Sequence, residues 1–204
     1  MGGQKPSHYQ MSTAANSDID IASRGLILIG AEPIASFSAD STEALVASNL
    51  YEDTVRTALC ASRWRFATNQ SSLNKLSATP TGRFDVAHQL PVDLLMLHAV
   101  TVDDQLIEYT IYGDKLFSNV QSNASLVADY TFRAKEINFP SYFTLAVEYA
   151  LAASFALAIA RDEAMAQMME RKAQQLMQQA KTLDSQQQTT RKLVTSRFIS
   201  ERRS

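Results

Sequence analysis

The sequence contains few of the residues that build covalent frameworks and metal centres. Its 204 residues include one cysteine and three histidines. The single thiol, Cys60, excludes an internal disulfide framework and a thiolate-rich zinc site. The histidines, His8, His88 and His98, are scattered along the chain. We therefore predict no metal site.

Glycine is also scarce. None of the six glycines belongs to a GxGxxG or GxxxxGK[ST] pattern, the loops that hold nucleotide phosphates. The HExxH motif of metalloproteases and the GxSxG motif of serine hydrolases are absent from the sequence as well. We therefore predict no bound cofactor and no enzymatic activity.

One catalytic alternative stays open. A thiol nucleophile with an imidazole base could be assembled only from Cys60 and one of the two later histidines. Cys60 lies close to the apolar face of a predicted helix, which favours a buried structural thiol. His88 and His98 lie in predicted strands and are interpreted as ordinary strand residues. An enzyme that uses Cys60 would show thiol reactivity in the native fold.

Long hydrophobic runs are missing too. No stretch reaches the roughly 18 uninterrupted apolar residues of a membrane span, so no membrane contact is predicted. The nearest stretch, residues 145–160, is rich in alanine and carries Glu148 and Ser154. We interpret it as a helix buried in protein. Residues 1–18 are polar and lack the apolar centre of an export signal, so we predict a flexible N-terminal arm.

The remaining composition is that of a folded domain. Hydrophobic residues make up 46% of the chain and charged residues 20%, which is enough for one domain with a real core. A first helix is predicted over 19–28, because Gly30 and Pro33 stop it. A second helix is predicted over 40–64, with Asp40 and Glu43 forming a capping box at its start.

The hydrophobic period changes between residues 69 and 138. Short runs of β-branched and aromatic residues alternate there with turn residues, which predicts an antiparallel sheet or long hairpins. Asp103 and Asp104 are interpreted as a turn, and Gly113 with Asp114 as the turn of a hairpin. The predicted strands are 84–87, 94–102, 107–112, 115–117 and 125–132.

Helical periodicity returns at Pro140, which suits a first helical turn. Residues 141–160 are apolar on nearly all sides, and 164–183 carry one apolar stripe. Whether these are two helices or one bent helix stays open. The methionines of this region, Met165, Met168, Met169 and Met177, indicate helix core, with an adaptable binding groove as the alternative.

The predicted fold class is therefore α+β. We expect a helical bundle of about four helices with an antiparallel β-rich insertion between the second and the third, followed by a polar C-terminal extension. The folded domain is predicted to span residues 19–183, with helices over 19–66 and 140–183 and the β insertion over 69–138. Trp64 and Phe66, at the end of the second helix, are interpreted as core anchors, with base stacking as the alternative.

The C-terminal end is basic. Residues 181–204 hold six basic and two acidic side chains, a net charge of +4, and because the whole chain carries −2, residues 1–180 carry −6. Apolar residues lie within this basic segment, so residues 184–204 are predicted to be a docking tail, and a solvated end is the open alternative. The predicted docking residues are Arg191, Lys192, Leu193, Arg197, Phe198, Ile199, Arg202 and Arg203.

Five short motifs follow one another along the chain. They are the turn LILIGAEPI at residues 26–34, the segment Trp64-Arg65-Phe66-Ala67, the segment Leu90-Pro91-Val92-Asp93, a hairpin from Tyr109 through Gly113 to Leu116, and Phe139-Pro140-Ser141-Tyr142-Phe143 before an alanine- and leucine-rich helix. In this order they resemble the head-to-tail adaptor proteins of short-tailed phages, the tail tubular protein A family. The resemblance covers roughly residues 20–180.

The resemblance implies a structural role in a virion. Members of that family form a twelve-fold ring between the portal protein and the tail nozzle, through which DNA passes without sequence-specific contact. The expected partners are further copies of the chain, the portal, the nozzle and, as a further candidate, tail fibres. The resemblance also implies assembly in the host cytoplasm and a place at the head-to-tail interface. The matched motif residues are Gly30, Glu32, Pro33, Trp64, Phe66, Pro91, Asp93, Gly113 and Pro140.

A binding module remains the alternative function. The basic C-terminal tail could bind nucleic acid, and that interpretation predicts DNA binding by the isolated protein that falls steeply with salt. For the adaptor, we expect residues 101–132 to contact neighbouring subunits or the nozzle and the helices to form the body of the ring.

Overall fold

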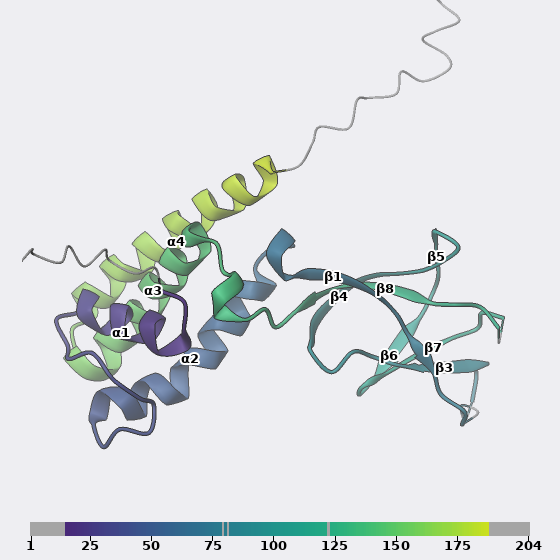
Figure 1. The fold of residues 1–204 in the computed structure, drawn as a ribbon, viewed down its shortest axis with the longest axis horizontal. Coiled ribbons are helices and arrows are strands. Elements are labelled where there is room, and N and C mark those ends of the chain that lie inside the picture. Colours follow the sequence, from purple (N-terminus) through teal and green to yellow (C-terminus); the bar gives the residue numbers. More distant parts are fainter. Residues whose placement is uncertain (1–14, 79, 81, 122, 188–204) are drawn as a thin grey trace, which may run out of the picture.

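The computed structural model describes residues 15–78, 80, 82–121 and 123–187. Within these ranges the chain forms four α-helices and two antiparallel β-sheets, which confirms the mixed α+β class. The helices and the strands occupy separate regions (Figure 1), called here the helical lobe and the β lobe. All the strands lie between the second and third helices in the chain.

Helix α1 (Asp18–Leu28) begins and ends where the sequence predicts. The Ser17 hydroxyl accepts a hydrogen bond from the Asp20 amide at 3.1 Å and so caps the first turn. Beyond the helix, Gly30 has a φ of +76°, the left-handed conformation that glycine adopts without steric cost. The Ser23 hydroxyl then bonds both backbone groups of Ile34, fixing the turn toward the next helix.

Helix α2 (Thr42–Cys60) is shorter than predicted at both ends. Its N-cap is Ser41, whose hydroxyl accepts from the Ala44 amide at 3.1 Å, so the predicted capping by Asp40 is wrong. The helix ends at Cys60 because the chain turns back there. The Ala58 carbonyl accepts from the Ala61 amide at 3.2 Å and also from the Trp64 indole at 2.9 Å, which joins the turn to the helix end.

The β lobe contains two four-stranded sheets, with the orders β1-β8-β4-β5 and β2-β3-β7-β6. Apolar residues from both sheets, among them Val100, Leu116 and Tyr130, share one core. The strands are β1 (Thr68–Ser72), β2 (Asn74–Lys75), β3 (Val86–Gln89), β4 (Leu94–Val102), β5 (Gln105–Leu106), β6 (Thr110–Tyr112), β7 (Lys115–Ser118) and β8 (Val127–Phe132).

The structure corrects several predicted strands. The strand predicted over 84–87 lies at 86–89, and of the one predicted over 107–112 only β6 is a strand, while β5 lies just before that range. Strand β1 is missing from the prediction, because its sequence TNQSS has no hydrophobic alternation and it is an edge strand that pairs only with β8. The two predicted turns are confirmed, with positive φ at Asp103, Asp104 and Gly113.

The C-terminal half of the helical lobe consists of two helices, which answers the question that periodicity leaves open. Helix α3 (Ser141–Phe155) passes into a π-helical turn (Ala156–Ala160), and Arg161 then adopts a φ of +54°. Helix α4 (Glu163–Gln186) starts with Asp162 as its N-cap and packs along α3. Two 3-10 turns, η1 (Arg65–Ala67) and η2 (Glu136–Asn138), flank the β lobe.

Helix α3 is the centre of the helical lobe. Phe143, Val147, Leu151 and Phe155 are fully buried among α1, α2 and α4. By length and composition alone, Ser141–Ala160 could cross a membrane, but more than half of its residues are buried inside the protein. Core helices of globular proteins have the same composition, because apolar residues on all sides mark a helix covered by neighbours.

Candidate functional site

An aromatic cluster lies where the helical lobe meets the β lobe. The rings of Trp64 and Phe66, from the turn after α2, pack against Phe139 and Phe143, from the start of α3, with centroids 4.9–5.8 Å apart. Two of the five sequence motifs therefore meet in space, although more than 70 residues separate them along the chain. The interpretation of Trp64 as a core anchor is confirmed, since its side chain is completely buried.

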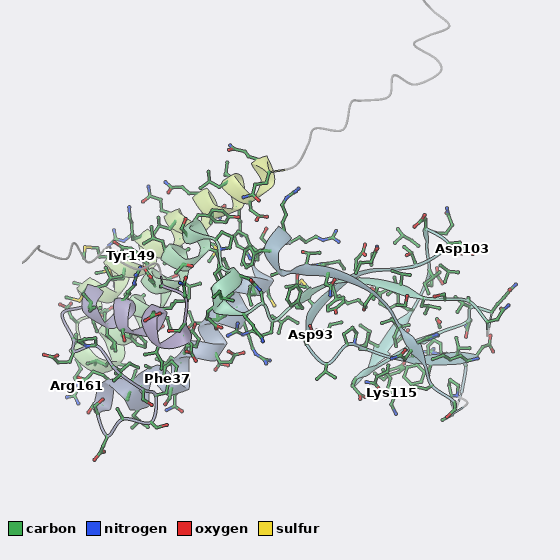
Figure 2. The ribbon with its side chains drawn as sticks, viewed as in Figure 1. Phe37, Asp93, Asp103, Lys115, Tyr149 and Arg161 are labelled. Atoms are coloured by element: carbon green, nitrogen blue, oxygen red, sulfur yellow. The ribbon has the colours of Figure 1, made fainter. Side chains whose placement is uncertain are left out.

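The other motif residues lie apart from this cluster. Gly30, Glu32 and Pro33 form the turn between α1 and α2, and Pro140 caps α3 beside the cluster. Pro91 and Asp93 precede β4, and Gly113 lies in the β6–β7 turn. Figure 2 shows Asp93 on the side of the β lobe that faces the helices. The motifs thus mark turns and packing points of the fold, and the structure does not gather them into one site.

A charged network connects the two lobes. Arg133, just after β8, donates to Glu52 of α2 at 2.9 Å and to Glu136 of η2 at 2.6 Å. The Tyr51 hydroxyl donates to the same Glu136 carboxylate at 3.1 Å. The Arg133 guanidinium also lies 5.9 Å from the centre of the Phe139 ring, close enough for a cation–π contact.

The pKa shifts in this network follow from its contacts. The hydrogen bond from Arg133 lowers the pKa of Glu52, although partial burial acts in the opposite direction. Burial, together with the Glu136 carboxylate, raises the pKa of Tyr51. At neutral pH the Glu52 carboxylate is therefore charged and the Tyr51 phenol is neutral, so both keep their hydrogen bonds in the network. No local pattern in the sequence indicates this network, because Arg133 is 81 residues from Glu52 and Glu136 is 85 residues from Tyr51.

A second contact fixes the C-terminal end of α4. The buried Asp184 carboxylate accepts hydrogen bonds from the Tyr142 hydroxyl at 2.9 Å and from the Arg65 amide at 3.2 Å. Burial and the neighbouring Asp184 raise the pKa of Tyr142 to about 12. Asp184, the first residue of the predicted tail, therefore belongs to α4. Gln187, the last described residue, lies beside η1, where its carbonyl accepts from the Arg65 guanidinium at 3.2 Å.

The predicted docking residues Arg191, Lys192, Leu193, Arg197, Phe198, Ile199, Arg202 and Arg203 lie outside the described residues, as do residues 1–14 of the predicted arm.

The residues considered for nucleophilic catalysis lie on three different elements. Cys60 is half-buried at the end of α2, whereas His88 lies on β3 and His98 on β4. His98 shares a hydrogen bond with the Thr131 hydroxyl at 2.7 Å. His88 is buried, and burial, with a contribution from the Lys75 charge, lowers its pKa, so its imidazole is neutral at pH 7.

The free edges of the two sheets expose apolar side chains. Leu106 on β5 and Ile111 and Tyr112 on β6 are exposed, and β5 and β6 are each the outermost strand of their sheet. The Tyr112 ring packs against Phe84 and Phe117. An outer strand has backbone groups that lack a neighbour within its sheet, so these edges are suited to contact another chain.

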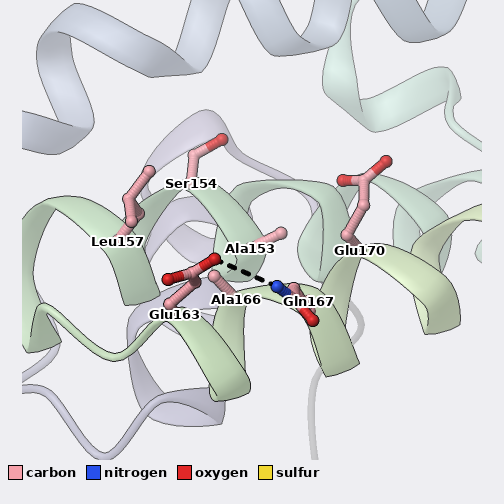
Figure 3. A pocket seen from close by; sticks show the side chains of 7 residues that line it. All are labelled: Ala153, Ser154, Leu157, Glu163, Ala166, Gln167 and Glu170. Atoms are coloured by element: carbon pink, nitrogen blue, oxygen red, sulfur yellow. Dashed lines mark hydrogen bonds between the residues drawn. The ribbon is translucent and has the colours of Figure 1, made fainter.

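A groove runs between α2, α3 and α4 in the helical lobe. One part, of about 400 Å³, is lined by Ala153, Ser154, Leu157, Glu163, Ala166, Gln167 and Glu170 (Figure 3). A second part, of about 360 Å³, is lined by Asp53, Thr54, Thr57, Ala58, Ala61, Ala150, Ser154, Glu170 and Met177. Ser154 and Glu170 line both parts, so the two hollows are neighbours, and together they are called the groove here. Of the methionine stripe, Met169 is buried as core, while Met168 is exposed.

One buried carboxylate lies on the opposite side of α3. Glu148 has a carboxylate oxygen 3.6 Å from the Arg24 guanidinium, and burial raises the pKa of this acid. A hollow of about 290 Å³ adjoins it, lined also by Ala15 and Asn16. Because Ala15 and Asn16 continue directly into residues 1–14, this hollow lies where the N-terminal segment joins the helical lobe.

No protein-family model matches the chain, and no curated protein matches it. Among the residues that the structure describes, no three side chains of the metal-binding types His, Cys, Asp and Glu lie close enough together to hold a metal ion.

Proposed function

We propose that this protein is a structural head-to-tail adaptor of a phage particle and not an enzyme. Copies of the chain would form a ring of twelve between the portal and the tail nozzle, with DNA passing through it. In this proposal the helices form a bundle, the strands form an insertion between its second and third helices, and residues 188–204 form a polar extension. The ring assembles in the host cytoplasm and becomes part of the virion tail.

The two-lobed architecture carries the proposal. A subunit of a closed ring needs two different side surfaces, because head-to-tail contacts join unlike faces. The helical lobe and the β lobe provide such faces, and the Arg133 network holds them in a fixed relation. The exposed strand edges with Leu106, Ile111 and Tyr112 fall within residues 101–132, where contacts with neighbours or the nozzle are expected.

The charge distribution is consistent with a DNA passage. Residues 1–180 carry a net charge of −6. Each phosphate contact made by lysine or arginine would add affinity, and an acidic body lets DNA slide without binding. Residues 188–204 hold five basic side chains and one acidic one, and this tail is assigned to the portal in this proposal.

The test is assembly on the cognate portal. Native mass spectrometry or light scattering would measure the mass of the protein alone and after mixing with purified portal rings. Full-length protein would be compared with a version that ends at Gln187 and with a full-length variant in which Arg191, Lys192, Arg197, Arg202 and Arg203 are changed to glutamine. Ending at Gln187 keeps Asp184 and the whole of α4.

We expect the full-length protein to add about twelve copies to each portal ring and both altered versions to lose this binding. If the altered versions also assemble, the adaptor role holds and the contact with the portal belongs to the folded lobes. If no version adds to the portal, the adaptor role is contradicted. Steeply salt-dependent DNA binding by the full-length protein would then support the alternative of a nucleic-acid-binding module.

A further inference from the structure

The groove between α2, α3 and α4 has a particular surface chemistry. Its lining includes five alanines, Ala58, Ala61, Ala150, Ala153 and Ala166. The carboxylates of Asp53, Glu163 and Glu170 stand exposed around it, and among the described lining residues no basic side chain balances them. Small side chains leave room for bulky apolar groups, and the carboxylates favour a positively charged occupant.

The π-helical turn at the end of α3 adds an apolar contact to this groove. Leu157, in that turn, is 61% exposed and lines the groove beside Ala153 and Ala166 (Figure 3). Wide turns of this kind inside or at the end of α-helices occur often at functional sites. An exposed leucine among alanines, next to carboxylates, is suited to a segment that combines apolar and basic residues.

We propose that this groove binds the chain's own C-terminal segment, residues 188–204, within the same molecule. The segment has the complementary chemistry: five basic residues accompany Leu193, Val194, Phe198 and Ile199, with Glu201 as its one acidic residue. This inference goes beyond the adaptor role and does not depend on it. Its consequence is that the tail is held on the helical lobe until a partner displaces it.

The starting point of the segment makes an intramolecular contact possible. Asp184 holds the end of α4 against Arg65. Arg65 comes four residues after Ala61, which lines the part of the groove beside α2. Along α4, Met177 lies about 15 Å and Glu163 about 36 Å from Gln187, at 1.5 Å per residue. The 17 residues after Gln187 span up to about 56 Å when extended, which is enough to turn back and follow the groove.

Paramagnetic relaxation in the full-length protein tests this contact. In a Cys60→Ser background, Phe198→Cys would carry a nitroxide spin label, and the methyl signals of Met177, Ala153 and Leu106 would be recorded. We expect the label to broaden the Met177 and Ala153 signals in the groove. The signal of Leu106, which is exposed on the β lobe, is the internal control and should not change.

Charge variants test the complementarity. Changing Glu163 and Glu170 together to glutamine should weaken docking about tenfold, because each lost surface ion pair changes the equilibrium a few-fold. The methyl broadening should fall accordingly, and it should also fall with added salt. Glu108→Gln removes an exposed carboxylate in the β lobe and should have no effect.

A mixed sample distinguishes the occupants. Spin-labelled protein without isotopes is mixed with isotope-labelled protein that lacks the spin label, so only contacts between molecules broaden the observed signals. Docking within one molecule predicts no broadening in this mixture. Broadening in the mixture would show that the groove binds the tail of a second copy. Absence of broadening in the protein that carries both the spin label and the isotopes would show that the tail does not occupy the groove. Either result overturns the proposal.

Discussion

Arg133 shows how much a single residue contributes to the relation between the two lobes. Its guanidinium bonds one carboxylate from α2 and another from η2. The Arg133 and Glu136 side chains are only 20% and 17% exposed, so water replaces their bonds poorly when one partner is removed. A nearby arginine, Arg56, bonds the same Glu52 from a mostly exposed position.

The first prediction compares these two arginines. Arg133→Met should lower the free energy of unfolding by about 2 kcal/mol, because it leaves the Glu136 carboxylate without its charged partner in a partly buried place. Arg56→Met should cost less than about 1 kcal/mol, as exposed ion pairs do. Urea unfolding curves measure both values. Equal losses would contradict the assignment of the Arg133 network as the connection between the lobes.

Single-residue features differ in how well the adjacent residues of the chain predict them. The left-handed conformation at Gly30 and the β6–β7 turn at Gly113 were predictable, because a turn is a local property of the backbone. The sequence predicted Asp40 as the N-cap of α2, whereas in the structure the neighbouring Ser41 is the N-cap. Both residue types cap helices well, so composition alone does not decide between adjacent candidates.

At the scale of elements, helix α1 approaches α3 closely at Gly25. Gly25 faces α3 where a Cβ atom would lie 3.2 Å from the Leu151 Cβ, 3.3 Å from the Glu148 carbonyl oxygen and 3.3 Å from the Phe155 ring. Such distances are tighter than most Cβ contacts, so a side chain at this position requires its neighbours on α3 to move by a few tenths of an ångström.

The second prediction enlarges that contact in two steps. Gly25→Val should destabilise the protein by about 2–3 kcal/mol, because the branched side chain forces α1 away from α3. Gly25→Ala adds only the Cβ atom, and its gain in helix propensity of about 1 kcal/mol offsets part of the overlap. Thermal unfolding compares the two variants. If valine were tolerated as well as alanine, the close approach of the helices would be contradicted.

The sequence predicted some helices and strands better than others, because their hydrophobic patterns differ in strength. Helix α1 and strand β4 were located well, since their hydrophobic periods are strong. The edge strands β1 and β2 were missed because they are polar and form only where a partner strand is already present. The end of α2 was placed too late, because the Trp64 turn that ends it depends on the aromatic cluster.

At the scale of the whole molecule, the end of α4 determines where the C-terminal segment begins. Asp184 accepts hydrogen bonds from Tyr142 and from the Arg65 backbone, joining α4 to α3 and to the start of the β lobe. A boundary drawn at residue 184 from charge alone would separate this buried carboxylate from the helix to which it belongs.

The third prediction uses two shortened versions of the chain. A version ending at Leu183 loses Asp184 and should be less stable than one ending at Gln187 by about 2 kcal/mol, because the Tyr142 hydroxyl and the Arg65 amide lose a charged acceptor. The version ending at Gln187 should stay within about 1 kcal/mol of the full-length protein, since a tail held at the surface contributes little. Urea unfolding measures the three. Equal stability of the two shortened versions would show that Asp184 does not hold α4.

The amino-acid sequence by itself determined the α+β class, the types of most elements, the turns at Gly30 and Gly113 and the separation of charge between body and tail. These properties depend on composition and on residues within a few positions of one another. Only the tertiary structure decided the pairing of the sheets, the end of α2, the Arg133 and Asp184 contacts and the acidic groove. Each of these depends on side chains that are far apart in the chain, and local periodicity does not indicate which distant residues will be in contact.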